Sequence, residues 1–447
     1  MTTKVARTTH IIFLFIGDGD GDAGEPSRTT SRPEAPFDCA VGAEFPAQSD
    51  GRPDGEYFQM THTHVARSET RDSARAGAEL GQAIRNAFGG AAADAVVVFA
   101  SAQHDYASLL AALRSEVGTD VIVGSSSAGE FTDQGRGEGQ VSALGLRSDQ
   151  MLFSVGLGKG VRDDPRGAAR QVVGAFRGVA RADYPYRTAL VMADALAGHA
   201  DMLVEEMTVG TSGTYRFFGG GAGDDGRFST THVFAGAEAC SNAVAALEIL
   251  SHKPVGIGVA HGWVPAGDGF RVTEAHGNLL VSLNGAPALE ALQEHARLTG
   301  QTLDLQDPMP FFLHNVLGIR SEEGYRLRVP LALAEGGAIA CAAAVPEGVI
   351  VHLMKTNADS AVQAAREAVR SALHALSGHE PAAAFVFDCV ATRLRLGRAF
   401  EDELQACAEL LAAAGFVGCN TYGQIARSEG QFGGFHNCTA VVCVLPQ

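Results

Sequence analysis

The chain has 447 residues, of which 46% are hydrophobic and 19% charged, so it can bury a sizeable core and is too long for one ordinary domain. Its 34 Lys and Arg residues against 51 Asp and Glu residues give a net charge of −17, which disfavours binding to nucleic acid or to anionic membrane surfaces. The eight cysteines include no C-x-x-C pair, so neither a zinc site nor a disulfide framework is expected, and a reducing cytoplasm is the simplest location.

The first 60 residues differ in composition from the rest of the chain. The apolar run at residues 11–16 is too short to span a bilayer, and the alternating Gly and Asp at 17–22 stand where a signal peptide would carry small residues for cleavage. Five prolines follow with no hydrophobic periodicity. We therefore expect residues 1–60 to form a disordered tail, and the alternative that translation begins at Met60 stays open.

From Thr61 onward one pattern of elements occurs three times, at residues 62–146, 151–235 and 349–445. Each copy reads as a strand, an amphipathic helix, a buried strand, a second helix, a strand that ends in a glycine turn, and a closing strand. A repeated unit explains this order better than chance. We predict an α/β fold, a two-domain sandwich built from three copies of a β-α-β-α-β-β unit.

A different block separates the second copy from the third. Three strand-like segments lie in it, at residues 255–261, 270–275 and 279–283. A helical pattern follows them. We place the domain boundary inside this block, so that residues 61–285 form a first domain with two copies and residues 286–447 form a second domain with one copy.

Each copy ends its third strand in a turn where glycine precedes a polar residue. The three pairs are Gly129-Glu130, Gly223-Asp224 and Gly423-Gln424. Glycine permits positive φ and close approach of a ligand to the backbone, and a neighbouring carboxylate or amide suits an ammonium group. If the copies assemble side by side, the turns gather at one edge and form a ligand site. The alternative is that these glycines serve turn geometry alone.

The candidate ligand-binding residues lie in these turns, around the only tryptophan, and before the last strand. Hydroxyl and amide groups there suit the carboxylate or hydroxyl of a ligand, while the tryptophan can wall a pocket or pack between two sheets. The full set is Ser125, Ser126, Ser127, Gly129, Glu130, Gly223, Asp224, His261, Trp263, Asn420, Tyr422, Gln424, His436 and Asn437.

Two other classes of function stay open. A haem-binding gas sensor would use a histidine near an apolar strand, namely His232, His261 or His436. A hydrolase would use Ser126 or Cys389 as its nucleophile, but no histidine stands at a recognisable motif spacing from either. No Walker, His-Glu-x-x-His or EF-hand motif occurs in the sequence. We therefore expect no catalytic residue and no metal site, and a protein that is not an enzyme.

At these segments the sequence resembles the FIST family, whose members carry an N-terminal and a C-terminal FIST domain. The matching stretches cover about residues 90–447, and their order makes the resemblance specific. They are residues 123–130, 218–224, 261–265, 272–278, 284–290, 387–389 and 436–439. One departure is Gln424, since family members usually carry Glu at this place in the last turn, and the amide weakens recognition of a cationic group.

The resemblance implies an intracellular sensor of small ligands, with amino acids as the proposed ligands. Some relatives bind haem, so the alternative implied is a haem-binding nitric oxide sensor that regulates a histidine kinase. We expect a cytoplasmic sensor that binds an amino acid or a similar metabolite. Because no effector domain follows in this sequence, we expect its signal to pass to a partner protein, such as a histidine kinase or a response regulator.

Overall fold

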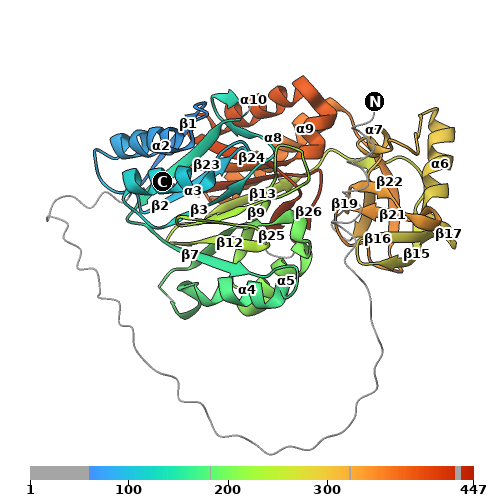
Figure 1. The fold of residues 1–447 in the computed structure, drawn as a ribbon, viewed down its shortest axis with the longest axis horizontal. Coiled ribbons are helices and arrows are strands. Elements are labelled where there is room, and N and C mark those ends of the chain that lie inside the picture. Colours follow the sequence, from blue (N-terminus) through green and yellow to red (C-terminus); the bar gives the residue numbers. More distant parts are fainter. Residues whose placement is uncertain (1–59, 138, 182, 322–323, 428–433) are drawn as a thin grey trace, which may run out of the picture.

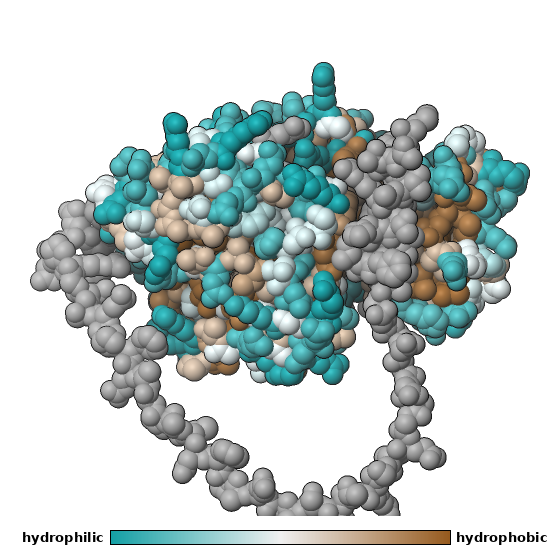
Figure 2. Space-filling model, viewed as in Figure 1, coloured by the Kyte–Doolittle hydropathy of each residue, from teal (hydrophilic) through white to brown (hydrophobic). Residues whose placement is uncertain are grey.

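The computed structural model describes residues 60–447, except 138, 182, 322–323 and 428–433. The expected disordered tail therefore lies outside the described residues apart from Met60. Figure 1 shows a larger body, in which helices cover several sheets, and a smaller lobe beside it. The face in Figure 2 is largely hydrophilic over the body, while hydrophobic residues are denser on the lobe.

The first sheet of the body contains the elements of the first predicted copy. These are β1 (Thr61–Ser68), α2 (Ser73–Ala87), β2 (Ala95–Ala100), α3 (Tyr106–Val117), β3 (Ile122–Ser126) and β6 (Val141–Ser148). The strands lie in the order β1-β6-β2-β3, and β2 runs parallel to β3 only. All six residues of β2 are buried, because helices cover one face of the sheet and the central core covers the other.

The second sheet has the same arrangement, in the order β9-β8-β12-β7. Its elements are β7 (Met151–Lys159), α4 (Pro165–Gly174), β8 (Tyr186–Ala193), α5 (Ala200–Gly210), β9 (Arg216–Gly221) and β12 (Ala243–Ser251). Sequence reasoning placed the closing strand at residues 231–235. The structure shows a different closing strand, β12, which is buried throughout and pairs with both β7 and β8.

The third sheet follows the order β13-β27-β23-β24. Its elements are β13 (Gly256–Ala260), α8 (Ala358–Ala375), β23 (Pro381–Cys389), α9 (Val390–Leu396), α10 (Phe400–Leu411), β24 (Gly415–Thr421) and β27 (Ala440–Pro446). Residues 349–354 were expected to open this copy. Instead β13 takes that place by pairing with β27, and residues 350–355 belong to the lobe.

Between the third and last strands of each sheet lies a two-stranded ribbon that extends a different sheet. The ribbons are β4 (Glu130–Thr132) with β5 (Gly135–Arg136), β10 (Val233–Ala235) with β11 (Glu238–Cys240), and β25 (Gln424–Arg427) with β26 (Phe435–His436). β4 pairs with β24, β10 with β3, and β25 with β9. The three sheets therefore exchange ribbons in a closed cycle.

The inner faces of the three sheets enclose one hydrophobic core. Phe99 from β2, Phe218 from β9 and Phe385 and Phe387 from β23 meet there. The rings of Phe99 and Phe387 are 5.6 Å apart and nearly perpendicular, and those of Phe218 and Phe385 are 5.5 Å apart. Such aromatic contacts add to the burial of apolar area, so the core binds the sheets together.

The lobe is inserted between β13 and α8. Its elements are β14 (Val264–Pro265), β15 (Phe270–His276), β16 (Leu279–Leu283), β17 (Ala286–Pro287), α6 (Ala288–Thr299), α7 (Met309–Phe312), β18 (Leu317–Ser321), β19 (Gly324–Arg328), β20 (Pro330–Leu333), β21 (Ile339–Cys341) and β22 (Ile350–Lys355). Its sheet runs β19-β18-β22-β15-β16-β21-β20, with its own apolar core. The boundary predicted between residues 285 and 286 falls at β17, within this lobe.

Four 3-10 turns complete the described elements: η1 (Gly178–Ala180), η2 (Ala195–Ala197), η3 (Glu335–Gly337) and η4 (Gly397–Ala399). Within the described part of the chain, none of the helices has both the length and the apolar character required to cross a membrane.

The close packing of β13 against α8 provides a test of this architecture. A Cβ added at Gly258 would lie 1.8 Å from the carbonyl oxygen of Ala368, so Gly258→Ala forces the helix away from the sheet. We expect it to lower the free energy of unfolding by about 1–3 kcal/mol, measured by urea denaturation. Gly174→Ala is the control, because a Cβ at that helical position meets no atom within 4 Å. Equal stability of both variants would contradict the packing.

Candidate ligand site between the lobe and the body

The three glycine turns meet at one end of the body, as the sequence predicted they would if the copies assembled. Three backbone hydrogen bonds join them in pairs: Gly223 N to Ser126 O (3.0 Å), Ala128 N to Asn420 O (2.9 Å) and Gly221 N to Gly423 O (2.8 Å). Backbone contact this close requires small residues, and a Cβ at Gly223 would lie 2.5 Å from Ala128 N. The turns therefore contact each other directly.

The side chains at the turns satisfy one another in large part. The Ser127 hydroxyl donates to the Glu130 carboxylate, and the Tyr422 hydroxyl donates to Asp224. The Tyr422 ring stacks on Phe228 at 4.3 Å. Together with Ala128, Leu196 and Val390, Tyr422 forms a small apolar cluster at the junction. This packing makes the turns a closed junction, and a ligand site there stays a prediction.

Some hydrogen-bonding capacity is left unused beside the first turn. Glu130 Oε2, Ser125 Oγ and Asn420 Nδ2 are buried and, among the described residues, have no hydrogen-bond partner. Burial raises the pKa of Glu130 to about 8 even though Ser127 donates to it, so this carboxyl is largely protonated at neutral pH. Gln424 is also buried, and its amide contacts the hydroxyl of Thr421 at 2.9 Å.

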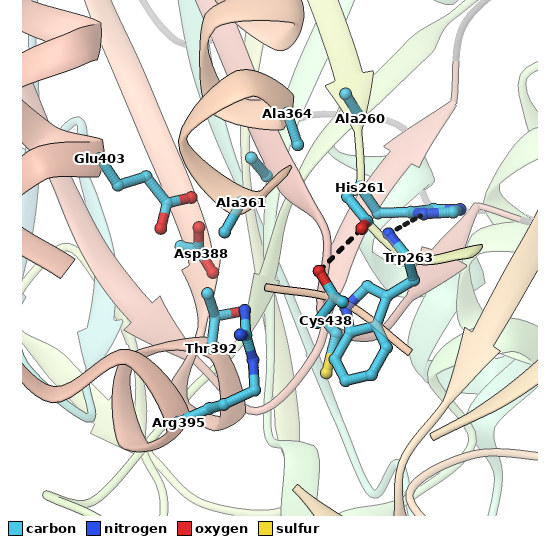
Figure 3. A pocket seen from close by; sticks show the side chains of 13 residues that line it. Ala260, His261, Trp263, Ala361, Ala364, Asp388, Thr392, Arg395, Glu403 and Cys438 are labelled. Carbon is cyan, nitrogen blue, oxygen red and sulfur yellow. Dashed lines mark hydrogen bonds between the residues drawn. The ribbon is translucent and has the colours of Figure 1, made fainter. Parts of the chain in front are cut away.

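A cavity lies next to this junction, where the lobe meets the body (Figure 3). Its volume of about 10 Å³ is the space that a single water needs. Its walls come from the chain leaving β13, from α8, β23, α9 and α10, and from the residues around the start of β27. The lining residues are Ala260, His261, Gly262, Trp263, Thr356, Ala361, Ala364, Asp388, Thr392, Arg395, Glu403, Cys438 and Ala440.

Two buried carboxyl groups lie side by side in the wall of this cavity. Asp388 stands near the end of β23 and Glu403 in the first turn of α10, each 3% exposed, and Figure 3 shows their carboxyls pointing together. Burial raises the pKa of Asp388 to about 6. Burial and the neighbouring Asp388 raise the pKa of Glu403 well above its usual range. Two such carboxyls retain a proton between them, because ionising both would bury two like charges.

A cationic side chain completes the lining. Arg395 of α9 is half-buried, and its guanidinium lies 5.4 Å from the centre of the Trp263 ring, within the range of a cation–π contact. Its Nε and Glu403 Oε2 are buried and have no hydrogen-bond partner in the described part of the chain. Leaving such atoms unpaired costs about 1–3 kcal/mol each, so the cavity has an unused donor and an unused acceptor.

The predicted His261 and Trp263 line the same cavity. His261 Nε2 bonds the Tyr325 carbonyl oxygen at 2.8 Å, and its Nδ1 accepts from the Trp263 backbone N–H at 3.3 Å. Burial lowers the pKa of His261, so the ring is neutral. Burial lowers the pKa of His436 to about 4, and its Nε2 bonds the Ala426 carbonyl oxygen.

Both connections between lobe and body pass the cavity. One runs through Gly262, the other through Thr356, and the Thr356 hydroxyl donates to the Gly262 carbonyl at 2.7 Å. Further along the interface, the buried Arg328 bonds Asp201 of α5 at 3.1 Å, and the predicted Asn437 accepts from the Val329 N–H at 3.4 Å. The cavity therefore lies at the point where the lobe is attached.

Sequence reasoning missed Arg395, Glu403 and Thr392, and named Asp388 only as the end of a buried strand and within a matching stretch, without a role in a site. A signal for Glu403 exists in the sequence. Phe400, Leu404 and Cys407 form the apolar face of their helix, and Glu403 falls on that face, where an acidic residue marks a buried charge.

Ser126, one of the two nucleophiles weighed from the sequence, has no hydrogen bond to a histidine ring among the described residues. The Ser126 hydroxyl exchanges hydrogen bonds with the backbone of His232 rather than with its imidazole.

The described residues contain no cluster of three or more His, Cys, Asp or Glu that could hold a metal ion.

Comparison with known proteins identifies the class to which this fold and site belong. Residues 94–286 match the FIST N domain and residues 288–427 match the FIST C domain. The chain belongs to the FIST family, whose domains are small-ligand sensory domains in signal transduction. This confirms the resemblance seen in the sequence. No curated protein matches the chain.

Among solved structures, the chain is similar to the cyanuric acid hydrolase from A. caulinodans, at 10% identity and a TM-score of 0.33. The similarity covers 87% of this chain and 100% of that one. This finding contradicts the expectation that the chain is not an enzyme, and that expectation is withdrawn because the similar structure is a hydrolase. A likeness this weak assigns no reaction to the chain.

The carboxyl pair makes stability depend on pH. Because their pKa values are raised, the folded state binds more protons than the unfolded state above about pH 4, so stability falls as pH rises. Glu403→Gln keeps the contact with Asp388 without needing a proton. We expect its free energy of unfolding to fall less between pH 5 and pH 8 than that of the wild type, by about 1–3 kcal/mol, in urea titrations.

The matched control is Glu401→Gln, an exposed position on the same helix. It should follow the pH dependence of the wild type. If Glu403→Gln and Glu401→Gln behaved alike, Glu403 would not share a proton with Asp388.

Proposed function

We propose that the chain is a cytoplasmic sensor that binds an amino acid or a similar metabolite in the cavity between lobe and body and signals through a separate protein. One observation carries the proposal: unpaired atoms of opposite chemical character, Glu403 Oε2 and Arg395 Nε, belong to side chains that line the same buried cavity. The sensory role of the FIST family supports the same conclusion.

The lining suits a ligand with an ammonium and a carboxylate group. The ammonium group binds the Asp388–Glu403 pair and takes the place of the proton that the pair holds. The carboxylate binds the guanidinium of Arg395, whose planar fork matches it in geometry. The Trp263 ring covers an apolar part of the ligand. An α-amino acid carries both charged groups on one carbon.

The cavity in this state has room for a single water, so an amino acid can enter only if the lobe moves relative to the body. A ligand that binds only the wider state shifts the equilibrium toward that state. Because both connections to the lobe border the cavity, the shift moves the lobe and changes the surface that a partner meets. A histidine kinase or a response regulator is the proposed partner, in keeping with the family's role in signal transduction.

The haem alternative has less support at this cavity, because both ring nitrogens of His261 already have hydrogen-bond partners. A colourless purified protein that takes up no added haem would remove this alternative.

Isothermal titration calorimetry with the twenty amino acids tests the proposal. We expect at least one to bind the wild type, and Glu403→Gln and Arg395→Gln to weaken that binding by about 10- to 100-fold, the loss of one charged hydrogen bond. Affinity should rise from pH 5 to pH 7, because binding releases the proton of the carboxyl pair.

Glu130→Gln is the matched control. It replaces another buried carboxyl with a raised pKa, but at the glycine turns. It should bind as the wild type does. If Glu130→Gln lost the ligand while Glu403→Gln retained it, the ligand would bind at the turns and the cavity site would be wrong. If no amino acid bound the folded wild type, the ligand class would be wrong.

A further inference from the structure

A buried arginine joins the lobe to the body in addition to the two chain connections. Arg328 ends β19, the edge strand of the lobe sheet that lies nearest the body in Figure 1, and it is 1% exposed. Its Nη2 donates to Asp201 Oδ2 at 3.1 Å, and its Nη1 donates to the carbonyl oxygen of Phe435 at 3.3 Å. Asp201 belongs to α5 and Phe435 to β26, so both contacts cross from the lobe to the body.

The same guanidinium is also held from within the lobe. Its Nε donates to the carbonyl oxygen of Ala344 at 2.9 Å, and its Nη1 donates to that of Leu327 at 3.0 Å. These carbonyl groups are neutral, whereas Asp201 supplies a carboxylate. Burial lowers the pKa of Arg328, and the charge of Asp201 acts against that shift. The buried position of the arginine therefore depends on its pairing with α5.

The strand that carries Arg328 also contacts the wall of the cavity. The carbonyl oxygen of Tyr325, on the same strand, accepts a hydrogen bond from His261 Nε2 at 2.8 Å. His261 lines the cavity, and the backbone N–H of Trp263 donates to its Nδ1. Displacement of β19 from the body therefore breaks the contact of Arg328 with Asp201 and the contact of Tyr325 with the cavity wall.

We propose that the Arg328–Asp201 pair is a latch that holds the lobe on the body and keeps the cavity closed. This inference rests on the proposed function, in which an amino acid enters only when the lobe moves. In the closed state the attraction of the buried pair is largely offset by the lost hydration of both charges. Asp201 Oδ1 is buried and, among the described residues, has no hydrogen-bond partner. Movement of the lobe returns these groups to water, so the contact can break and re-form.

Asp201→Asn tests the latch in the full-length chain. The variant leaves the charge of Arg328 uncompensated in the closed state alone, so it favours the open state. The reporter is the backbone N–H of Val329, whose acceptor, Asn437 Oδ1, belongs to the body. Without ligand, we expect this N–H to exchange with deuterium about 10-fold faster or more than in the wild type. Exchange in β15 and β16, within the lobe, should not change.

The variant should also bind more tightly any amino acid that binds the wild type, by about 10-fold, because more of the protein is in the open state. Glu205→Gln is the matched control, since it removes an exposed carboxylate from the same helix. It should exchange at Val329 and bind amino acids as the wild type does.

Unchanged exchange at Val329 in Asp201→Asn would overturn the latch, whether or not any amino acid binds. Faster exchange throughout β15 and β16 would also overturn it, because the pair would then stabilise the fold of the lobe itself. An unchanged affinity for an amino acid would show that this contact does not close the cavity. If no amino acid bound any variant while Val329 exchanged faster in Asp201→Asn, the latch would stand and the ligand class proposed for the cavity would be wrong.

Discussion

The whole architecture depends on three sheets sharing one hydrophobic core. Each sheet buries its inner face against the other two, and each receives a ribbon from a neighbour, so that none is complete alone. At one end this arrangement brings three glycine turns into backbone contact. Direct contact there leaves the turns filled by their own side chains. The buried polar cavity lies instead beside them, where the inserted lobe meets the body.

That cavity combines chemistry that a protein core does not normally tolerate. A carboxyl pair, a guanidinium with an unpaired Nε and the Cys438 thiol belong to side chains that line it. Buried groups of this kind cost stability unless they are paired, so their concentration at one place is typical of a functional site. The cavity lies beside both connections to the lobe, since Gly262 and Thr356 line it.

Local patterns in the sequence predicted part of this structure. The buried strand at Ala95–Ala100 and the glycine turns follow from hydrophobic runs and turn residues, and both are present. β12 was missed because its Ala, Leu and Glu residues favour helix, whereas its burial on both faces selects a strand. The place of β13 depends on pairing with β27 at the far end of the chain. The meeting of Asp388 with Glu403 likewise depends on tertiary packing that no local pattern contains.

The cyclic exchange of ribbons has a consequence for how the chain can be divided. The N-terminal sheet is completed by β10, the middle sheet by β25 and the C-terminal sheet by β4, while β13 closes on β27. Cutting the chain between its two family segments would leave the middle and C-terminal sheets without an outer strand, and open strand edges promote aggregation. The two FIST segments thus complete each other's sheets, because β4 of the first pairs with β24 of the second and β25 of the second pairs with β9 of the first.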